Sequence, residues 1–215
     1  MDPVLTAIGR QWPELAGDTP PSRDALALRL ARVCPQWTLA APDRTERYED
    51  AIAAGRIPTR EHSWHDAFNV RAFAEFPRAK AALHARMRPL PVRDGRRTRE
   101  GDALALLDEA ALVFAGDAIA LAAFAAARDS LDALDDVMRS RRIAVRCFGH
   151  ALLEHRALAR KPIDAGVVAL EVDAPAQIDL ALATAIARGR FAAPDFSPTV
   201  PWPDPRVDAW LLAGL

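Results

Sequence analysis

Residues 143–154, IAVRCFGHALLE, decide the fold, because they join a predicted strand directly to a predicted helix. The stretch from Ile143 to Phe148 predicts a β-strand. Gly149 predicts a turn into a helix that covers His150 to about Leu158. The domain therefore contains both kinds of element.

Helix-start and helix-stop signals dominate the chain before this stretch. Ser22 and Ser63 each occupy the position of a helix N-cap, and Pro77 can open a further helix. Pro35 and Gly55 follow predicted helix ends. Four helices are expected, at about residues 23–33, 45–54, 64–75 and 77–87.

Residues 102–115 allow two interpretations, a helix or a hairpin that turns at Asp108-Glu109. A long helix is expected after Gly116, through about residue 138. A strand over 167–172 and a helix over about 175–187 follow. The Pro-rich segment 194–205 is expected to be irregular, with Trp202 and Trp210 docking the tail onto the domain.

These elements predict one α+β domain that is mostly helical. Its small sheet, antiparallel or mixed, is expected to form from the regions of Val113, Ile143 and Val167. We expect a single globular domain over 1–215, with the core at about 22–190 and an irregular tail over 194–215.

Composition narrows the class of protein. The 215 residues are 51% apolar and 27% charged, with a net charge of −1, which argues against a polybasic membrane binder or a general nucleic-acid coat. The two cysteines, Cys34 and Cys147, form no CxxC pair, which excludes zinc ribbons and disulfide scaffolds and favours a reducing compartment. No apolar run is long enough to span a membrane, and the first residues do not resemble a signal peptide. We expect a cytoplasmic protein.

Charge is distributed in blocks. Residues 86–101 carry six arginines and two acids, residues 102–138 carry eight acids and one arginine, and residues 139–161 carry seven bases and one acid. These blocks form either solvated faces of opposite sign or two basic flanks of an anion site. In the second interpretation Arg93, Arg96 or Arg97 meets Arg142 or Arg146 at one cleft, and Arg141, Arg142 and Arg146 lead into the helix that begins at His150. Arg142 and Arg146 are the candidate anion-binding residues.

Two predicted helices carry polar pairs on faces that are otherwise apolar. At about 100° per residue, His65 and Asn69 fall inside the aromatic face of the 64–75 helix. His150 and Glu154 fall inside the apolar arc of the later helix, whereas His155 and Arg156 lie on its other side and are expected at the surface. The four inward groups either form a structural hydrogen-bond network or converge on one ligand.

Both histidines lie in the first turn of their helices. The positive end of the helix dipole disfavours imidazolium, so both rings are expected to be neutral and able to bind a proton or a metal. The adjacent carboxylates Asp108 and Glu109 could complete a metal site. Asp66 fits two roles equally, because Ser63-x-x-Asp66 also matches a capping box.

Five blocks occur in a characteristic order: GRIPTR (55–60), WHDAFN (64–69), FPRAKAAL (76–83), DALALLDE (102–109) and FGHALLE (148–154). Together they resemble the mainly proteobacterial family known as domain of unknown function 3025, over roughly residues 24–175. The resemblance implies a hairpin around Asp108-Glu109, and an asparagine is expected where this chain has His84. The matching motif positions are His65, Asp66, Asn69, Lys80, Asp108, Glu109, His150 and Glu154. Lys80 lies in one block of a chain that otherwise uses arginine, which fits a need for an ammonium group.

The preferred function is a cytosolic enzyme that acts on a small anionic metabolite by acid/base or metal-assisted, hydrolytic chemistry. The candidate catalytic residues are His65, Asp66, Asn69, Lys80, His150 and Glu154. The candidate ligands of a divalent metal are His65, Asp108, Glu109 and His150. The alternative is a non-catalytic binding or scaffold protein whose polar cluster is structural. A nucleic-acid module that uses the Arg86–Arg99 loop is least favoured, because of the overall charge.

Overall fold

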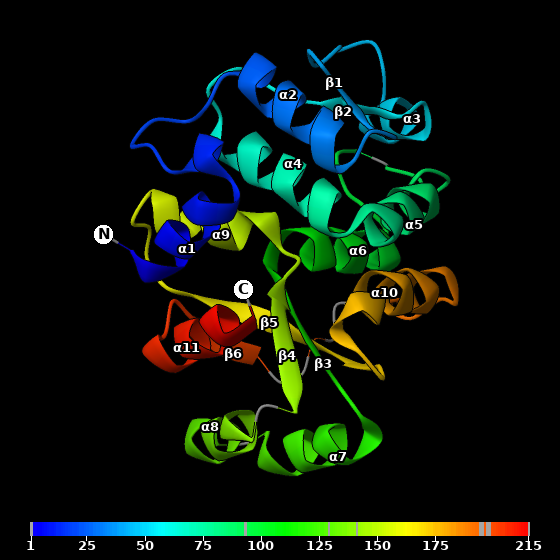
Figure 1. Cartoon of the computed structure of the whole chain (residues 1–215). Helices are drawn as coiled ribbons and strands as arrows, with labels where there is room; N and C mark the ends of the chain where they lie inside the picture. Colours follow the sequence, from blue (N-terminus) through cyan, green and yellow to red (C-terminus); the bar gives the residue numbers. More distant parts are fainter. Residues whose placement is uncertain are drawn as a thin grey trace.

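A mostly helical α+β fold with a small mixed sheet is observed, as predicted (Figure 1). The structure is a computed structural model that describes residues 2–92, 94–128, 130–140, 142–193, 196 and 199–214. The helices are α1 (Pro3–Gln11), α2 (Arg23–Val33), α3 (Tyr48–Ala53), α4 (Trp64–Glu75), α5 (Pro77–Met87), α6 (Arg99–Ala110), α7 (Ala118–Ala127), α8 (Leu131–Arg139), α9 (His150–Ala157), α10 (Ile178–Ala187) and α11 (Pro205–Gly214). The strands are β1 (Thr38–Ala40), β2 (Arg56–Pro58), β3 (Ala111–Gly116), β4 (Ile143–Cys147), β5 (Ile163–Glu171) and β6 (Thr199–Trp202).

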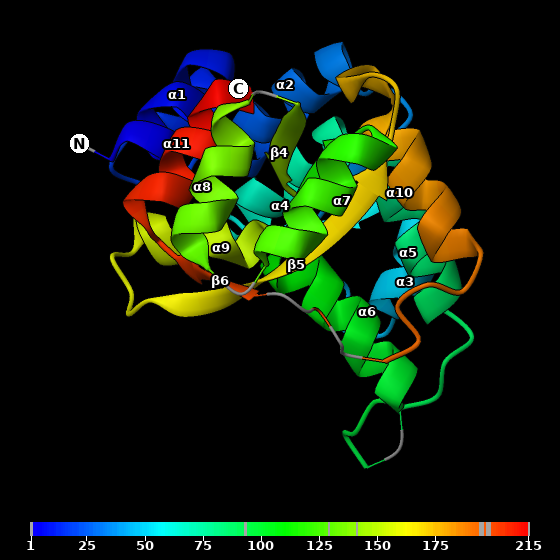
Figure 2. The ribbon, with the colours of Figure 1, turned by 90° about the horizontal axis from the view of Figure 1, so that it is seen from below.

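The larger sheet has the strand order β4-β3-β5-β6. Strand β3 pairs antiparallel with β4 and parallel with β5, and β5 pairs antiparallel with β6. The short strands β1 and β2 form a separate parallel pair. In Figure 1 the helices α7 and α8 lie at one end of the molecule, below the sheet, and Figure 2 shows them in front of it when it is viewed from below. The helices that carry the histidine pairs lie on the other side.

Local sequence signals place most helix boundaries as expected. The Ser22 hydroxyl accepts from the backbone N–H of Ala25, and the Ser63 hydroxyl accepts from that of Asp66. Pro77 occupies the first position of α5. The helix expected over 45–54 begins later, at Tyr48, because Asp43 accepts hydrogen bonds from both the N–H and the hydroxyl of Thr45 and forms a turn there.

The hairpin interpretation of residues 102–115 is wrong. Helix α6 continues through Asp108 and Glu109 to Ala110, and the chain enters β3 at the next residue without a turn. All six residues of β3 are buried, and β3 lies between β4 and β5 in the interior of the sheet. The two carboxylates therefore lie in the last turn of a helix, directly before a central strand.

Two other expectations are corrected. The long helix expected after Gly116 is two helices, α7 and α8, because Ser130 caps the second one through the N–H of Ala133. Most of the described tail is regular, because 199–202 is strand β6 and 205–214 is helix α11, whereas 196 and 203–204 are irregular as expected. Trp202 and Trp210 are buried, as expected of docking residues. Among the described residues, no helix has both the length and the apolar character that crossing a membrane requires.

Candidate functional site

Helices α4 and α9 pack against each other and bring the two first-turn histidines together. The Nε2 atoms of His65 and His150 are 3.0 Å apart, and the rings meet edge to face with centroids 4.5 Å apart. Two residues separated by 85 positions in sequence thus form one pair, from the two helices in which the sequence placed unexpected polar groups.

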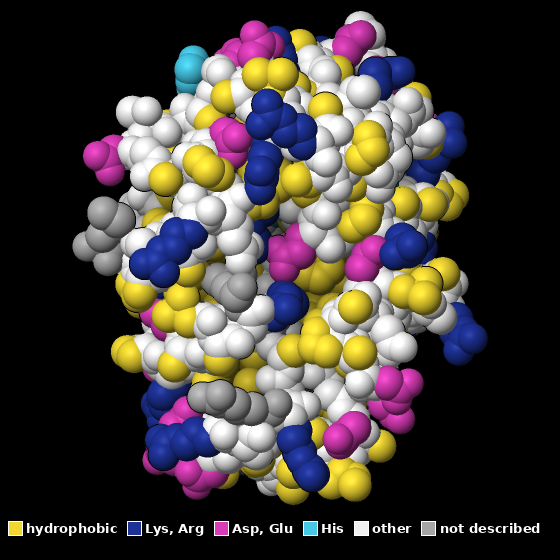
Figure 3. Space-filling view, in the orientation of Figure 1, with side chains coloured by type: hydrophobic (Ala, Val, Ile, Leu, Met, Phe, Trp, Pro, Cys, Tyr) yellow, Lys and Arg dark blue, Asp and Glu magenta, His cyan; other side chains and the backbone are white. Residues whose placement is uncertain are grey.

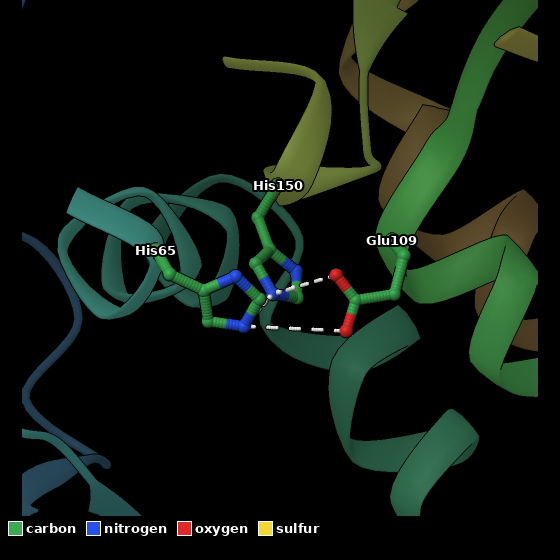
Figure 4. Close-up of side chains that lie close together, drawn as sticks. All are labelled: His65, Glu109 and His150. Carbon is green, nitrogen blue, oxygen red and sulfur yellow. Dashed lines mark hydrogen bonds and ion pairs between the residues drawn. The ribbon is translucent and has the colours of Figure 1, made fainter. Parts of the chain in front are cut away.

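The end of α6 supplies a carboxylate to this pair (Figure 4). Glu109 Oε2 lies 3.4 Å from His150 Nε2, and Glu109 Oε1 lies 4.0 Å from His65 Nε2. One ligand atom from each of the three residues lies within 4.8 Å of the others. Two imidazoles and a carboxylate are a donor set typical of catalytic zinc and non-haem iron sites. Below, His65, Glu109 and His150 are called the His/His/Glu cluster.

Gly149 sets the position of His150 relative to Glu109. A Cβ atom at residue 149 would lie 2.6 Å from the backbone N of Ala110 and 2.7 Å from the carbonyl oxygen of Glu109, and it would also meet the N of Ala111. Only glycine lets the start of α9 approach the α6–β3 junction so closely. The Gly149 N–H donates to the Ala111 carbonyl at 2.8 Å, which fixes this approach.

Glu154 lies behind His65 and sets its tautomer. Glu154 Oε2 is 3.0 Å from His65 Nδ1, and Glu154 Oε1 accepts from the Arg160 guanidinium at 3.1 Å. A carboxylate only accepts, so His65 Nδ1 carries a proton and Nε2 is the ring nitrogen that faces the cluster. Carboxylates hold metal-binding histidines in this way.

His150 is neutral, as the sequence predicted, but mainly for a different reason. Its side chain is 3% exposed, and burial, followed by the nearby Lys80 charge, lowers its pKa to about 3, although the Asp108 carboxylate and backbone act in the opposite direction. Within the described part of the chain, Nδ1 of His150 makes no hydrogen bond of normal geometry. The ring is therefore held as an uncharged base in the interior.

Lys80 is fully buried beneath the cluster. Its ammonium donates to Asp108 Oδ1 at 2.5 Å and to Asn69 Oδ1 at 2.7 Å, and it lies over the rings of Phe73 and Phe148. The Asn69 amide in turn donates to the Tyr48 hydroxyl at 2.9 Å. Asp108 therefore pairs with Lys80, and its carboxylate is not part of the group of three possible ligands.

The pKa values of the adjacent carboxylates Asp108 and Glu109 are shifted in opposite directions. Burial acts to raise the pKa of Asp108, but the Lys80 ammonium and the neighbouring histidines outweigh it, so this pKa lies far below its usual range. Burial raises the pKa of Glu109, although His65 opposes this effect. Neighbouring carboxylates whose environments push their pKa values apart are a feature of acid/base sites.

A cavity of about 370 Å³ opens beside the cluster. Six of the residues singled out from the sequence line it: His65, Asp66, Asn69, Asp108, Glu109 and His150. Lys80 and Glu154 are not among the lining residues and act through their partners Asn69, Asp108 and His65. The predicted convergence of His65, Asn69, His150 and Glu154 on one region of the molecule is thus observed.

Asp66 has a partner that the sequence did not suggest. Its carboxylate accepts from the Arg60 backbone N–H at 2.6 Å and from the Arg60 guanidinium at 2.9 and 2.7 Å. Burial acts to raise the pKa of Asp66, but its hydrogen bonds to Arg60 lower it overall. Half of the capping box is present, since Ser63 caps the Asp66 N–H, but the acid turns to Arg60 instead of Ser63.

The two basic blocks do not meet at this cavity. Arg97 lines it, whereas Arg142 and Arg146 line a separate cavity of about 920 Å³. Arg146 also lies 3.7 Å from Glu75. Arg93 and Arg141 lie outside the described residues. In Figure 3 the basic side chains of the visible face are scattered among acidic and hydrophobic ones, and they form no continuous basic surface there.

The cavity-lining residues Arg60, Tyr48 and His84 were not among the candidate site residues, whereas Arg97 was expected to flank an anion site. Two of these residues carried a signal in the sequence. Tyr48 is the only tyrosine of the chain, and His84 stands where the family resemblance implies an asparagine. Their contribution depends on long-range packing, which no local pattern encodes.

The comparison of the sequence with protein families bears out the resemblance of the matched blocks. Residues 34–203 match the family described as "Protein of unknown function (DUF3025)", and the chain belongs to this family. The match extends through β6, further toward the C-terminus than the resemblance seen in the motifs. No curated protein and no solved structure matches the chain.

Proposed function

We propose that the protein is a metal-dependent enzyme that hydrolyses a small anionic substrate. A divalent cation would be held by Nε2 of His65, Nε2 of His150 and the carboxylate of Glu109. The observation that carries this proposal is the approach of the two Nε2 atoms to 3.0 Å, with both facing Glu109. Two bonds of about 2.1 Å at 90–110° place their nitrogen atoms about 3.0–3.4 Å apart, as in known metal sites.

Hydrogen-bond polarity supports a cation at this point. Glu154 accepts the Nδ1 proton of His65, so Nε2 is the nitrogen that would offer its lone pair to a cation beside His150. The low pKa of His150 disfavours a positive charge on the second ring. A metal ion between the nitrogens and the carboxylate would satisfy every lone pair without protonating a buried imidazole.

The chemistry of such a centre is hydrolytic. A three-ligand site leaves positions for water, and a divalent metal lowers the pKa of that water so that it becomes a nucleophile near neutral pH. Its oxygen would add to the electrophilic atom of the substrate, the bond to the leaving group would break, and a proton would pass to that group. Arg97 lines the same cavity and would attract an anionic substrate.

A structural role is the second candidate. The Lys80–Asp108 pair and the Asn69–Tyr48 hydrogen bond fasten α5, α6, α4 and α3 to one another, as a scaffold network would. In that case the His/His/Glu cluster would extend the network, and it would bind no metal.

Metal titration separates the two functions. We expect one equivalent of Zn²⁺ or Mn²⁺ to bind the wild type in calorimetry and to raise its melting temperature. His150→Gln and Glu109→Gln should abolish binding, and Glu154→Gln should weaken it about 10–100-fold through the tautomer of His65. His62→Gln, which changes an exposed histidine, is the matched control and should bind like the wild type.

The opposite result would favour the scaffold. If metals and EDTA leave the melting curve unchanged while His150→Gln costs on the order of 1–3 kcal/mol of unfolding free energy, the cluster is structural and the enzyme proposal is withdrawn.

A further inference from the structure

The hydrogen-bond chain that begins at Lys80 has a fixed direction. An ammonium group only donates, so the Asn69 atom 2.7 Å from Lys80 Nζ is the amide oxygen. The amide nitrogen of Asn69 therefore faces Tyr48 and donates to its hydroxyl oxygen at 2.9 Å. The Tyr48 oxygen is the acceptor in this bond, and its own proton remains to be donated elsewhere.

No described residue accepts the Tyr48 proton in a hydrogen bond, although the ring is largely buried. Tyr48 lines the cavity of the His/His/Glu cluster and also an adjoining cavity of about 200 Å³. Burial, followed by the Asp108 charge, raises its pKa, so the hydroxyl keeps its proton. A polar group with unused hydrogen-bonding capacity at a cavity wall favours a ligand that supplies the missing partner.

His84 provides a second unpartnered polar side chain at the same wall. It is 3% exposed, and neither ring nitrogen has a hydrogen-bond partner in the described part of the chain. Its ring stacks on Phe73 with an interplanar angle of 3° and lies 5.2 Å from the Tyr48 ring. Because His84 is neutral, it offers one N–H donor and one acceptor.

Arg97 brings a positive charge to both cavities. Within the described ranges it makes no ion pair, whereas Arg47, at the adjoining cavity, lies 3.7 Å from Glu49 and Arg60 pairs with Asp66. Glu49 lines both cavities as well, so the wall is not uniformly basic. Arg97 is thus the cation of this wall without a carboxylate partner.

We propose that Tyr48, His84 and Arg97 form a recognition subsite for an oxyanion, the carboxylate or phosphate group of the substrate. A hydroxyl, a guanidinium and an imidazole N–H are donors suited to the lone pairs of such a group. This inference rests on the proposed function in one respect: that function places the reacting bond at the His/His/Glu cluster. The substrate is then an elongated small molecule, with the oxyanion toward the adjoining cavity and the hydrolysable bond at the metal.

Calorimetric titration with inorganic phosphate and acetate tests the subsite, with metal-free protein first and zinc-loaded protein second. The wild type should bind at least one of the two ions in the metal-free state. Tyr48→Phe keeps the ring and removes only the hydroxyl, and Arg97→Gln removes the charge. Each should weaken binding at least tenfold. Arg142→Gln, in the separate cavity, is the matched control and should leave binding unchanged.

The outcomes of this test are independent of those for metal binding. Oxyanion binding that depends on Tyr48 and Arg97 supports the subsite even if no metal binds and the proposed function fails. Wild-type affinity in Tyr48→Phe, an absence of binding to the wild type, or a loss in Arg142→Gln overturns the subsite, whatever the metal titration shows. Circular dichroism and the melting temperature of Tyr48→Phe should match those of the wild type, which checks that the fold is intact.

Discussion

Lys80 shows how one side chain can tie a site together. It is one of two lysines among 28 basic residues, and it is completely buried. The sequence indicated a need for an ammonium group there, and the structure gives the physical reason: a compact charge between an amide oxygen, a carboxylate and two aromatic rings. An arginine fork is larger and planar and would not fit this arrangement.

Replacing Lys80 tests this arrangement. Lys80→Met leaves the Asp108 carboxylate buried without its cation, so we expect the free energy of unfolding to fall by about 3–5 kcal/mol in urea denaturation. Adding Asp108→Asn removes the stranded charge and should recover part of the loss. A loss below about 1 kcal/mol in the single variant would contradict the buried pair.

His84 makes stability depend on pH. Burial lowers its pKa from 6.5 to about 4, with Lys80 adding to the effect and Asp108 opposing it. Between these values the unfolded chain binds the proton and the folded chain does not, so the free energy of unfolding falls as the pH falls from 6.5 to 4. His84→Asn should make this dependence shallower, measured by urea denaturation across that range, while the buried His150 supplies the part that remains. His62→Asn, at an exposed position, should retain the slope.

At the scale of elements, the site depends on three helix ends. The first turns of α4 and α9 and the last turn of α6 meet at the cluster. Sequence predicted both helix starts, because Ser63 and Gly149 are local signals. It left the end of α6 open, because Ala110-Ala111 carries no glycine or proline to mark the change from helix to strand. The burial of β3 on both faces decides that boundary, and this is a property of the tertiary fold.

Gly149 is the position where this meeting of elements is most sensitive. Gly149→Ala places a Cβ against the backbone atoms of residues 109–111, which cannot move aside as a flexible side chain can. We expect overpacking to cost about 1–3 kcal/mol and to shift His150 away from Glu109, with a loss of metal affinity. Thermal unfolding and metal titration measure the two effects.

Gly17→Ala is the matched control. The nearest atom to a Cβ at residue 17 is 3.7 Å away, which is an ordinary contact, so stability should change little. If both variants behave alike, close packing at Gly149 does not position the cluster.

At the scale of the whole molecule, the two ends of the described chain meet on α9. Sequence predicted Trp202 and Trp210 as docking residues but not the regular elements that carry them. Pro201 and the surrounding prolines argue against a strand in the sequence. Strand β6 nevertheless contains Pro201, because β6 is an edge strand and a proline is tolerated there. The Trp202 indole donates to the Leu152 carbonyl of α9 at 2.8 Å, so the C-terminal segment is anchored to the helix that carries His150.

Arg156 is the clearest difference between the sequence expectation and the structure. Helical periodicity placed it on the outer surface of α9, yet its side chain is only 3% exposed. Helical periodicity assumes that a helix packs on one core, whereas the outer side of α9 at Arg156 contacts the start of α1 and α11. Arg156 donates to Asp2, which caps α1, and to Asp208 in the first turn of α11, and it lies over the Trp202 ring.

Replacing this arginine should loosen both ends of the chain at once. Arg156→Met leaves two carboxylates without their cation in a largely buried position, so we expect a loss of about 3–5 kcal/mol in urea denaturation, with faster proteolytic release of the terminal segments. Arg156→Lys keeps the charge, but an ammonium cannot bind two carboxylates as one planar guanidinium does. Its free energy of unfolding should therefore lie between those of the wild type and Arg156→Met. Arg206→Gln breaks an ion pair whose partner, Asp132, is 93% exposed, and it should cost at most about 1 kcal/mol. Equal losses in Arg156→Met and Arg206→Gln would mean that Arg156 does not join the three helices.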